Sequence, residues 1–316
     1  MTTGIEVRIT EIGWETDAVR RFELRSVSGD ELPEFTAGAH IDLHLPIGLT
    51  RSYSLLNSQN ERHRYVIAVS REPDGRGGSR YLHEQAKPGE RLHISKPRNL
   101  FPLAEHAATT ILLGGGIGVT PLLSMARRLQ DLERSWKLVY CSRSRSVAAF
   151  ADALAAFGPE HVDFWFDDER PGFLDIAALL RADRSAHFYC CGPKPMMAAF
   201  EQAASETALP SSQSHVEYFQ PKEDVAPQGG FSVELARTGL RIAIPPGKSI
   251  LDALKDAGIS TTSSCEAGIC GECQVGVLAG TPDHHDSVLS DAEQASNKMM
   301  MICCSGSKSE LLVLDL

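Results

Sequence analysis

Hydrophobic and polar positions alternate along residues 1–104 in the manner of β-strands that are buried on one face. Ile41-Asp-Leu43-His-Leu45 alternates strictly, and Tyr65-Val-Ile-Ala-Val69 is a short apolar run. Turn sequences such as Pro46-Ile-Gly48 and Pro73-Asp-Gly75 separate segments of this kind. The spacing predicts a small antiparallel β-barrel.

Over residues 105–220 the hydrophobic pattern becomes that of alternating strands and helices. Short strands are predicted at 109–113, 136–141, 162–166, 187–191 and 215–219, and helices near 147–157, 173–182 and 195–207. A further helix is expected to begin with Thr120 as its N-cap and Pro121 as its first residue. This order predicts a five-stranded parallel α/β sheet that binds its ligand at the carboxyl ends of the strands.

The last part of the chain, residues 230–316, follows a polar linker at 221–229 that contains two prolines. Its pattern predicts a hairpin of strands 231–235 and 240–244, and later strands at 274–278, 299–303 and 311–315. One helix begins at Ser249 and ends at Gly258, and a second begins at Ser290. A mixed sheet with one packed helix is a β-grasp (α+β) layout.

Composition and charge narrow the class of protein. No apolar run of the 316 residues approaches the ~20 residues of a membrane span, and no signal-peptide pattern opens the sequence. We therefore expect a cytoplasmic protein without a membrane partner. The net charge of −10 argues against nucleic acid. Residues 230–316 hold six Lys/Arg and eleven Asp/Glu, which is either a surface that steers a basic partner or an ordinary solvated surface.

Three cysteines near the C-terminus carry the strongest chemical signal. Cys265, Cys270 and Cys273 have the C-x4-C-x2-C spacing of plant-type [2Fe-2S] domains, which take a fourth cysteine from far along the chain. Gly268 and Gly271 give the loop the backbone freedom to wrap a cluster. A structural zinc site usually uses two C-x2–4-C pairs, and disulfides need an oxidising compartment. The spacing thus predicts a [2Fe-2S] cluster.

The fourth ligand is either Cys303 or Cys304. In the strand predicted there, adjacent side chains point to opposite faces, so only one of the two can bind iron. The remaining cysteines, Cys141, Cys190 and Cys191, lie in apolar strand runs typical of core residues. The pair His284-His285 is expected to be solvated in a loop.

Two stretches of the barrel indicate a flavin. Arg51-Ser-Tyr53-Ser54 offers a cation for a phosphate, an aromatic face for a flat ring and a hydroxyl donor. Gly75-Arg-Gly77-Gly78-Ser79 precedes a helical pattern, so its N–H groups can bind an anion. Each alone would fit an unremarkable strand or turn, but together, upstream of a nucleotide lobe, they favour a flavin site.

Two glycine-containing loops of the parallel sheet indicate a dinucleotide. Gly114-Gly115-Gly116-Ile-Gly118 and Cys191-Gly192-Pro193 both follow strands of the predicted sheet. The usual fingerprint is incomplete, because Val119 stands where the third glycine belongs and Cys141-Ser-Arg143, without an acid, ends the second strand.

Taken together, these segments resemble the phthalate dioxygenase reductase and vanillate O-demethylase reductase family over essentially the whole chain. The segments that carry the resemblance are Arg51-Ser-Tyr53-Ser54, Gly75-Arg-Gly-Gly-Ser79, Gly115-Gly-Ile-Gly-Val-Thr120-Pro121, Cys190-Cys191-Gly192-Pro193 and Ser263-Ser264-Cys265-Glu-Ala-Gly-Ile-Cys270-Gly-Glu-Cys273. Where the family has an arginine shortly after its last cluster ligand, this chain has Gly306.

The resemblance implies a role for individual residues. The FMN site would comprise Arg51, Ser52, Tyr53, Ser54, Val69, Ser70, Gly77, Gly78, Ser79 and Phe219, with Tyr53 and Ser54 next to the reacting ring. The NAD site would comprise Gly115, Gly116, Thr120, Pro121, Cys191, Gly192 and Pro193. The last cluster ligand would be Cys303, in addition to Cys265, Cys270 and Cys273. NADH is implied rather than NADPH, although Arg143 and Arg145 could accept a 2′-phosphate.

The implied activity is electron transfer from NADH through FMN and the cluster to a Rieske-type oxygenase on another polypeptide. A hydride carries two electrons and the cluster accepts one, so a flavin is needed between them. This chain has no Cys-x-His pair of a Rieske centre. Alternatives are a free-standing flavin or quinone reductase, FAD in place of FMN, and a C-terminal domain that acts as a redox sensor or binding module.

Overall fold

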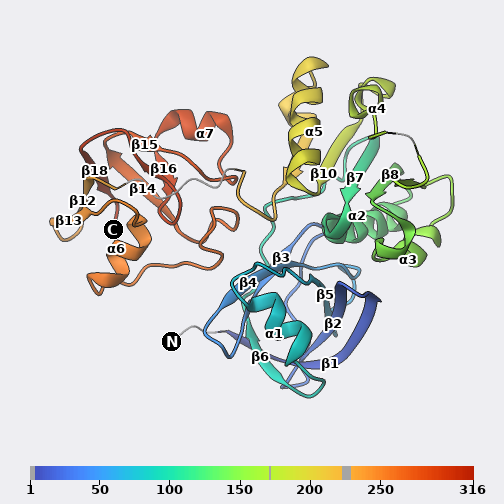
Figure 1. Ribbon diagram of the computed structural model, residues 1–316, viewed down its shortest axis with the longest axis horizontal. Coiled ribbons are helices and arrows are strands. Elements are labelled where there is room, and N and C mark those ends of the chain that lie inside the picture. The colour runs from blue at the N-terminus through green and yellow to red at the C-terminus, as the bar shows by residue number, and fades with distance from the viewer. Residues whose placement is uncertain (1–3, 171, 223–228) are drawn as a thin grey trace. The chain divides into compact units, whose positions relative to one another are not determined.

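The computed structural model describes residues 4–170, 172–222 and 229–316. The chain divides into two compact units, Met1–Glu217 and Tyr218–Leu316 (Figure 1), and we describe each by itself. Most of the predicted linker 221–229 lies outside the described residues. Within the described ranges, every helix is too short or too polar to cross a bilayer.

An antiparallel sheet of six strands forms the first half of the first unit. Its strands are β1 (Ile5–Thr16), β2 (Val19–Ser26), β3 (His40–His44), β4 (Thr50–Ser54), β5 (Tyr65–Ser70) and β6 (Arg91–Ile94), in the order β4-β3-β6-β1-β2-β5. The edge strands β4 and β5 contact each other, and Leu56 N–H donates to the Val66 carbonyl at 3.0 Å. The sheet is therefore curled into a half-barrel around its apolar core, as predicted. Helix α1 (Gly78–Glu84) follows β5 and packs on the barrel (Figure 1).

A five-stranded parallel sheet forms the second half of this unit. Its strands are β7 (Thr109–Gly115), β8 (Ser135–Ser142), β9 (Val162–Phe166), β10 (His187–Cys191) and β11 (Ser214–Glu217), in the order β11-β10-β7-β8-β9. The helices are α2 (Val119–Asp131), α3 (Ala151–Ala155), α4 (Ile176–Ala182) and α5 (Lys194–Glu206), with 3-10 turns η1 (Gly116–Gly118), η2 (Arg145–Val147) and η3 (Ser211–Gln213). Figure 1 shows α2 and α3 on one side of the sheet and α4 and α5 on the other, as right-handed connections require. The prediction of a parallel α/β sheet is confirmed.

The expected start of the helix after β7 is wrong. Helical geometry begins earlier, because η1 runs directly into α2 and Val119 N–H bonds to the Gly116 carbonyl. Gly118 is therefore the N-cap of α2, and Thr120 and Pro121 lie inside its first turn. The Thr120 hydroxyl donates to the Ile117 carbonyl at 3.0 Å instead of accepting from a helix N–H.

Side chains of the parallel sheet tie it to the barrel at three places. The buried Tyr189 hydroxyl accepts from Ala104 N–H at 2.7 Å and donates to the Pro102 carbonyl at 3.2 Å. From α2, Ser124 donates to the Asn57 carbonyl at 3.3 Å. A third hydrogen bond, 3.1 Å long, joins Asn60 to Asp131. These contacts fix the nucleotide sheet against the barrel.

The second unit is a mixed sheet packed on one main helix. Its strands are β12 (Phe231–Leu235), β13 (Leu240–Ile244), β14 (Gln274–Ala279), β16 (Met299–Met301) and β18 (Leu311–Leu314), in the order β13-β12-β18-β14-β16, beside the short pair β15 (Pro282–Asp283) and β17 (Gly306–Ser307). Helix α6 (Ile250–Asp256) has Ser249 as its N-cap, and α7 (Asp291–Ser296) has the capping box predicted at Ser290. The β-grasp prediction is confirmed, except that the strand expected at 299–303 ends at Met301.

Candidate cofactor and cluster sites

The four cysteines chosen from the sequence are buried together in the second unit. Cys265, Cys270, Cys273 and Cys303 are each less than a tenth exposed. Between the first three, Gly268 and Gly271 have positive φ angles of 69° and 76°, so the loop depends on glycine there as expected. The loop wraps the thiols and keeps them out of solvent.

The thiols form two pairs. Hydrogen bonds join Cys265 to Cys270 and Cys273 to Cys303. Backbone groups also point at sulfur, because the N–H of Ala267 donates to Cys265 Sγ at 3.4 Å. A [2Fe-2S] cluster takes two protein ligands on each iron, so these residues fit it. Among the described residues, no group of three or more His, Cys, Asp or Glu side chains is placed to hold a single metal ion, as a zinc site would require.

The expected separation of Cys303 and Cys304 onto opposite faces of a strand is wrong. The chain turns after Met301, and both residues lie in that turn. The Cys304 sulfur lies against the cysteine loop, since a Cβ added to Gly268 would come within 2.5 Å of it. Two thiols therefore reach the same side of the loop, which no alternating pattern could predict.

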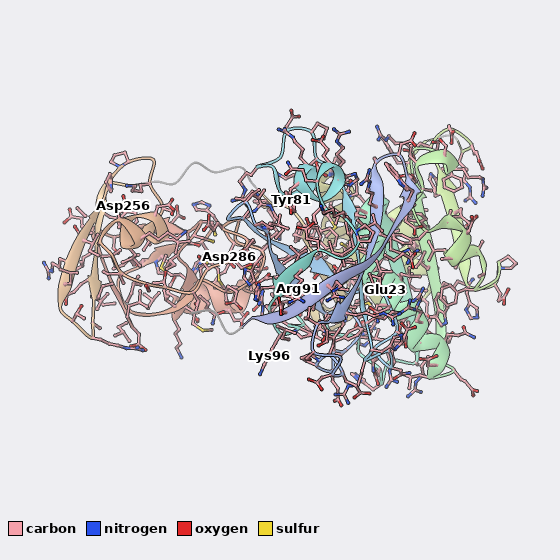
Figure 2. All side chains as sticks on the ribbon, turned by 90° about the horizontal axis from the view of Figure 1, so that it is seen from below. Glu23, Tyr81, Arg91, Lys96, Asp256 and Asp286 are labelled. Atoms are coloured by element: carbon pink, nitrogen blue, oxygen red, sulfur yellow. The ribbon has the colours of Figure 1, made fainter. Side chains whose placement is uncertain are left out.

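The expectation that His284 is solvated is also wrong. Its side chain is only 8% exposed, and Nδ1 lies 3.7 Å from Asp286 Oδ1. Neither ring nitrogen of His284 has a hydrogen-bond partner among the described residues. Asp286, which Figure 2 labels, accepts from the N–H groups of Val288 and Leu289 at 3.1 and 2.8 Å. The histidine thus belongs to the interior of the second unit.

Three segments that were predicted to bind a flavin meet at the open side of the barrel. The Arg51 side chain lies across the start of α1, where a Cβ added to Gly78 would be 2.9 Å from Arg51 Cγ and 3.0 Å from Nε. Gly77, the N-cap of α1, has φ 100°. The end of β5, with Val69 and Ser70, contacts both β4 and α1. A cation and a glycine turn therefore stand together, which fits the phosphate of a flavin.

The other barrel residues of the predicted flavin site take different positions. Tyr53 is partly buried against the barrel core, and burial raises the pKa of its hydroxyl. Ser54 is buried. The Ser52 hydroxyl donates to Asp42 at 2.7 Å inside the barrel, and Ser79 Oγ accepts from Glu72 N–H at 3.1 Å. These serine hydroxyls thus organise the protein around the site.

The two loops that were predicted to bind a dinucleotide pack backbone on backbone. A Cβ on Gly118 would come within 2.3 Å of the Cys191 carbonyl, and one on Gly115 would be 2.7 Å from Pro193 Cδ and 3.4 Å from Gly192 Cα. Gly116 has φ 54°. The turn η1 also contacts strand β5 of the barrel. The nucleotide loop and the flavin strand are therefore neighbours within one unit.

Glu217 is a site residue that sequence reasoning missed. It ends β11 opposite Cys191, and its Oε2 is buried without a hydrogen-bond partner among the described residues. Burial raises the pKa of this carboxyl group to about 8, so it is largely uncharged at neutral pH. An acid at the end of an apolar strand was the available signal. Phe219 lies two residues further on, in the second unit and partly buried, and its approach to the flavin stays a prediction.

The two arginines considered as 2′-phosphate ligands follow β8. The Arg145 guanidinium lies 4.7 Å from the centroid of the Phe166 ring and pairs with Glu169 at 3.5 Å. The Arg143 carbonyl accepts from Asp168 N–H at 3.2 Å. Acidic residues from the end of β9 therefore compete with any phosphate for the charge of Arg145.

Two family models match the chain where these sites lie. Residues 112–202 match the oxidoreductase NAD-binding domain, and residues 233–307 match the 2Fe-2S iron-sulfur cluster binding domain. The class is therefore an oxidoreductase in which a nucleotide lobe and an iron–sulfur domain share one chain. The predictions of an NAD-binding lobe and a [2Fe-2S] domain are confirmed.

Relatives match along almost the full length. The chain is 51% identical to the phenoxybenzoate dioxygenase subunit beta of Ectopseudomonas oleovorans over 99% of this chain and 97% of that protein. It is 45% identical to the tetrachlorobenzoquinone reductase of Sphingobium chlorophenolicum, over 99% and 98%. It is also 45% identical to the vanillate O-demethylase oxidoreductase of Pseudomonas putida, over 96% of each chain.

Solved structures agree with this assignment. The structure of phthalate dioxygenase reductase, described as modular for electron transfer from pyridine nucleotides to [2Fe-2S], has a TM-score of 0.75 and 38% identity, and covers 99% of this chain and 98% of its own. An intact type IV self-sufficient cytochrome P450 monooxygenase gives a TM-score of 0.88 at 34% identity over 99% of this chain, which spans only 41% of that longer one. The chain belongs to the phthalate dioxygenase reductase and vanillate O-demethylase oxidoreductase family.

Proposed function

We propose that this protein is the reductase component of a two-component oxygenase and passes electrons from NADH through FMN and a [2Fe-2S] cluster to a Rieske-type partner. The observation that carries the proposal is the coexistence, in one chain, of two buried thiol pairs and a nucleotide loop that contacts the flavin strand. FMN accepts the two electrons of a hydride together and gives them up singly, as a one-electron cluster requires.

In the barrel, Arg51 and the turn Gly77–Ser79 hold the FMN phosphate. Their support is the packing of Arg51 on Gly78 and the left-handed backbone of Gly77. Tyr53 presents its ring to the flavin and Ser54 offers a hydroxyl near the reacting edge. The remaining neighbours of FMN are Ser52, Val69, Ser70 and Phe219.

In the parallel sheet, the loops at the carboxyl ends of β7 and β10 hold NADH. Gly115, Gly116 and Gly192 let the backbone approach the pyrophosphate, as the close packing of these loops supports. Thr120, Pro121, Cys191 and Pro193 shape the nicotinamide end. The uncharged Glu217 carboxyl beside Cys191 is available to hydrogen-bond the carboxamide.

In the second unit, Cys265 and Cys270 bind one iron and Cys273 and Cys303 bind the other. The thiol pairing supports this division. The partner is an oxygenase component, because the related proteins carry names of oxygenase subunits and demethylases. This chain has no Cys-x-His pair of a Rieske centre, so oxygen chemistry is assigned to the partner.

Replacement of Cys270 by serine separates the two halves of the proposed pathway. The Cys270→Ser variant should still reduce its flavin with NADH in a stopped-flow experiment, because the first unit is untouched. It should lose reduction of cytochrome c, a one-electron acceptor, together with acid-labile sulfide. Cys141→Ser is the matched control and should keep both activities. Full cytochrome c reduction by Cys270→Ser would contradict the proposal.

A second candidate function is two-electron reduction of a quinone, which the tetrachlorobenzoquinone reductase at 45% identity favours. A quinone that accepts a hydride directly from flavin would not need the cluster. Tetrachlorobenzoquinone turnover that is unchanged in Cys270→Ser would support this function.

A further inference from the structure

We propose that Cys304 donates an S–H hydrogen bond to the cluster ligand Cys303 and thereby raises the potential at which the cluster accepts an electron. Cys304 is a positioning residue and not a ligand. The inference rests on the proposed cluster ligands, which are tested separately below.

The turn after β16 places both sulfurs beside the cysteine loop. The Cys303 thiol hydrogen-bonds with the thiols of Cys273 and Cys304 and with the backbone of Gly268. Cys304 hydrogen-bonds with Cys303 but not with Cys273, which it influences only through its charge. Cys303 therefore stands between the two, and Cys304 is one step further from the thiol pair.

The other acceptors near Cys304 are poorer. Its Sγ is 3.8 Å from the Met301 carbonyl and 3.9 Å from Ser305 Oγ, both near the outer limit for sulfur. The Met301 carbonyl already accepts from the N–H of Ser305 at 3.0 Å and of Cys304 at 3.4 Å. The sulfur of Cys303 is thus the acceptor that is left for the Cys304 S–H group.

The cysteine loop is shaped to leave room for this second sulfur. Gly268 has φ 69°, and a Cβ there would lie 2.5 Å from Cys304 Sγ and 3.2 Å from Asp286 Cα. The Gly268 carbonyl accepts from Ser287 N–H at 2.9 Å, so the loop cannot move away on that side. Gly268 is therefore required both by the backbone and by the Cys304 side chain.

The effect on the potential follows from charge. Reduction adds one electron to the cluster, and part of that charge resides on the ligand sulfurs. A donor aimed at such a sulfur stabilises the reduced form more than the oxidised form, and hydrogen bonds to sulfur are among the factors that set cluster potentials. Because an S–H group is a weak donor, the shift should be modest but measurable.

The test compares Cys304→Ala and Cys304→Ser with the intact full-length protein. Cluster potential is measured by an EPR-monitored redox titration, and iron and acid-labile sulfide are determined on the same samples. Cys304→Ala should keep a full cluster and shift its potential to a more negative value. Cys304→Ser should shift it less, because the hydroxyl group can still donate. Cys141→Ser is the control for loss of a thiol elsewhere.

Three results would overturn the inference. These are an unchanged potential in Cys304→Ala, equal shifts in the alanine and serine variants, and loss of the cluster in Cys304→Ala while Cys303→Ala retains it. The last result would make Cys304 the ligand. Gly268→Ala, which displaces the Cys304 sulfur, should shift the potential in the same direction as Cys304→Ala. Loss of the cluster in Cys303→Ala tests the ligand assignment independently.

Discussion

At the scale of single residues, Glu23 is the clearest case of a buried charge that is stabilised by its partners. It is 4% exposed and lies on β2 in the barrel (Figure 2). Burial opposes its ionisation, but hydrogen bonds from Arg64, Arg25 and Thr10 outweigh it and lower its pKa from 4.5 to about 2. The bonds measure 2.8, 2.7 and 2.9 Å.

A Glu23→Gln substitution should reduce the free energy of unfolding by roughly 2 to 3 kcal/mol at pH 7. A lowered folded-state pKa contributes stability that is present above 4.5 and is lost as the pH falls towards 2. The deficit of the variant should therefore shrink between pH 4.5 and pH 2. Urea denaturation across this range measures it, and a deficit that does not depend on pH would refute the assignment.

Glu217 has the opposite linkage. Burial raises its pKa from 4.5 to about 8, so its contribution to stability is complete below pH 4.5 and is lost as the pH rises through 8. Glu217→Gln should therefore gain stability relative to the parent protein as the pH increases, reaching roughly 3 kcal/mol near pH 9. Thermal unfolding at pH 5, 7 and 9 checks this, and parallel melting curves would contradict it.

At the scale of elements, the contact between the loop after β7 and the loop after β10 positions the nucleotide. Gly118 has an ordinary helical φ of −63°, so only the 2.3 Å approach to the Cys191 carbonyl excludes a side chain there. Gly118→Ala should separate the loops and lower kcat/KM for NADH by about 100-fold. Gly89→Ala, at a turn with open space around it, should leave kcat/KM unchanged. Equal values for both variants would show that the close packing has no role.

The sequence was sufficient where a local pattern decides the structure. The Ser290 capping box, the hairpin around Gly239 and the positive φ at Gly268 each depend on a few neighbouring residues. The helix start at Gly116 could not be predicted, because η1 extends α2 backwards through contacts with other strands. The turn at Cys303 and the burial of Glu217 depend on distant segments in the same way.

At the scale of the whole molecule, residues 1–217 form a compact unit that contains both the flavin and the nucleotide loops. Produced alone, this fragment should bind FMN and reduce ferricyanide with NADH at a rate within about twofold of the intact protein, because its core is complete without the second unit. It should not reduce cytochrome c. Circular dichroism is the check on folding, and a fragment that is folded but does not oxidise NADH would contradict this division of labour.

Inside that unit, the hydrogen bonds of Tyr189, Ser124 and Asn60 reach the barrel from β10 and α2. Attachments on two separate elements leave no axis about which the barrel and the nucleotide lobe could hinge. The separation between hydride donor and acceptor is consequently inherited from folding and does not depend on a closing motion. Admission of the nicotinamide then requires only that side chains change rotamer, so viscosity should have little influence on the rate of flavin reduction.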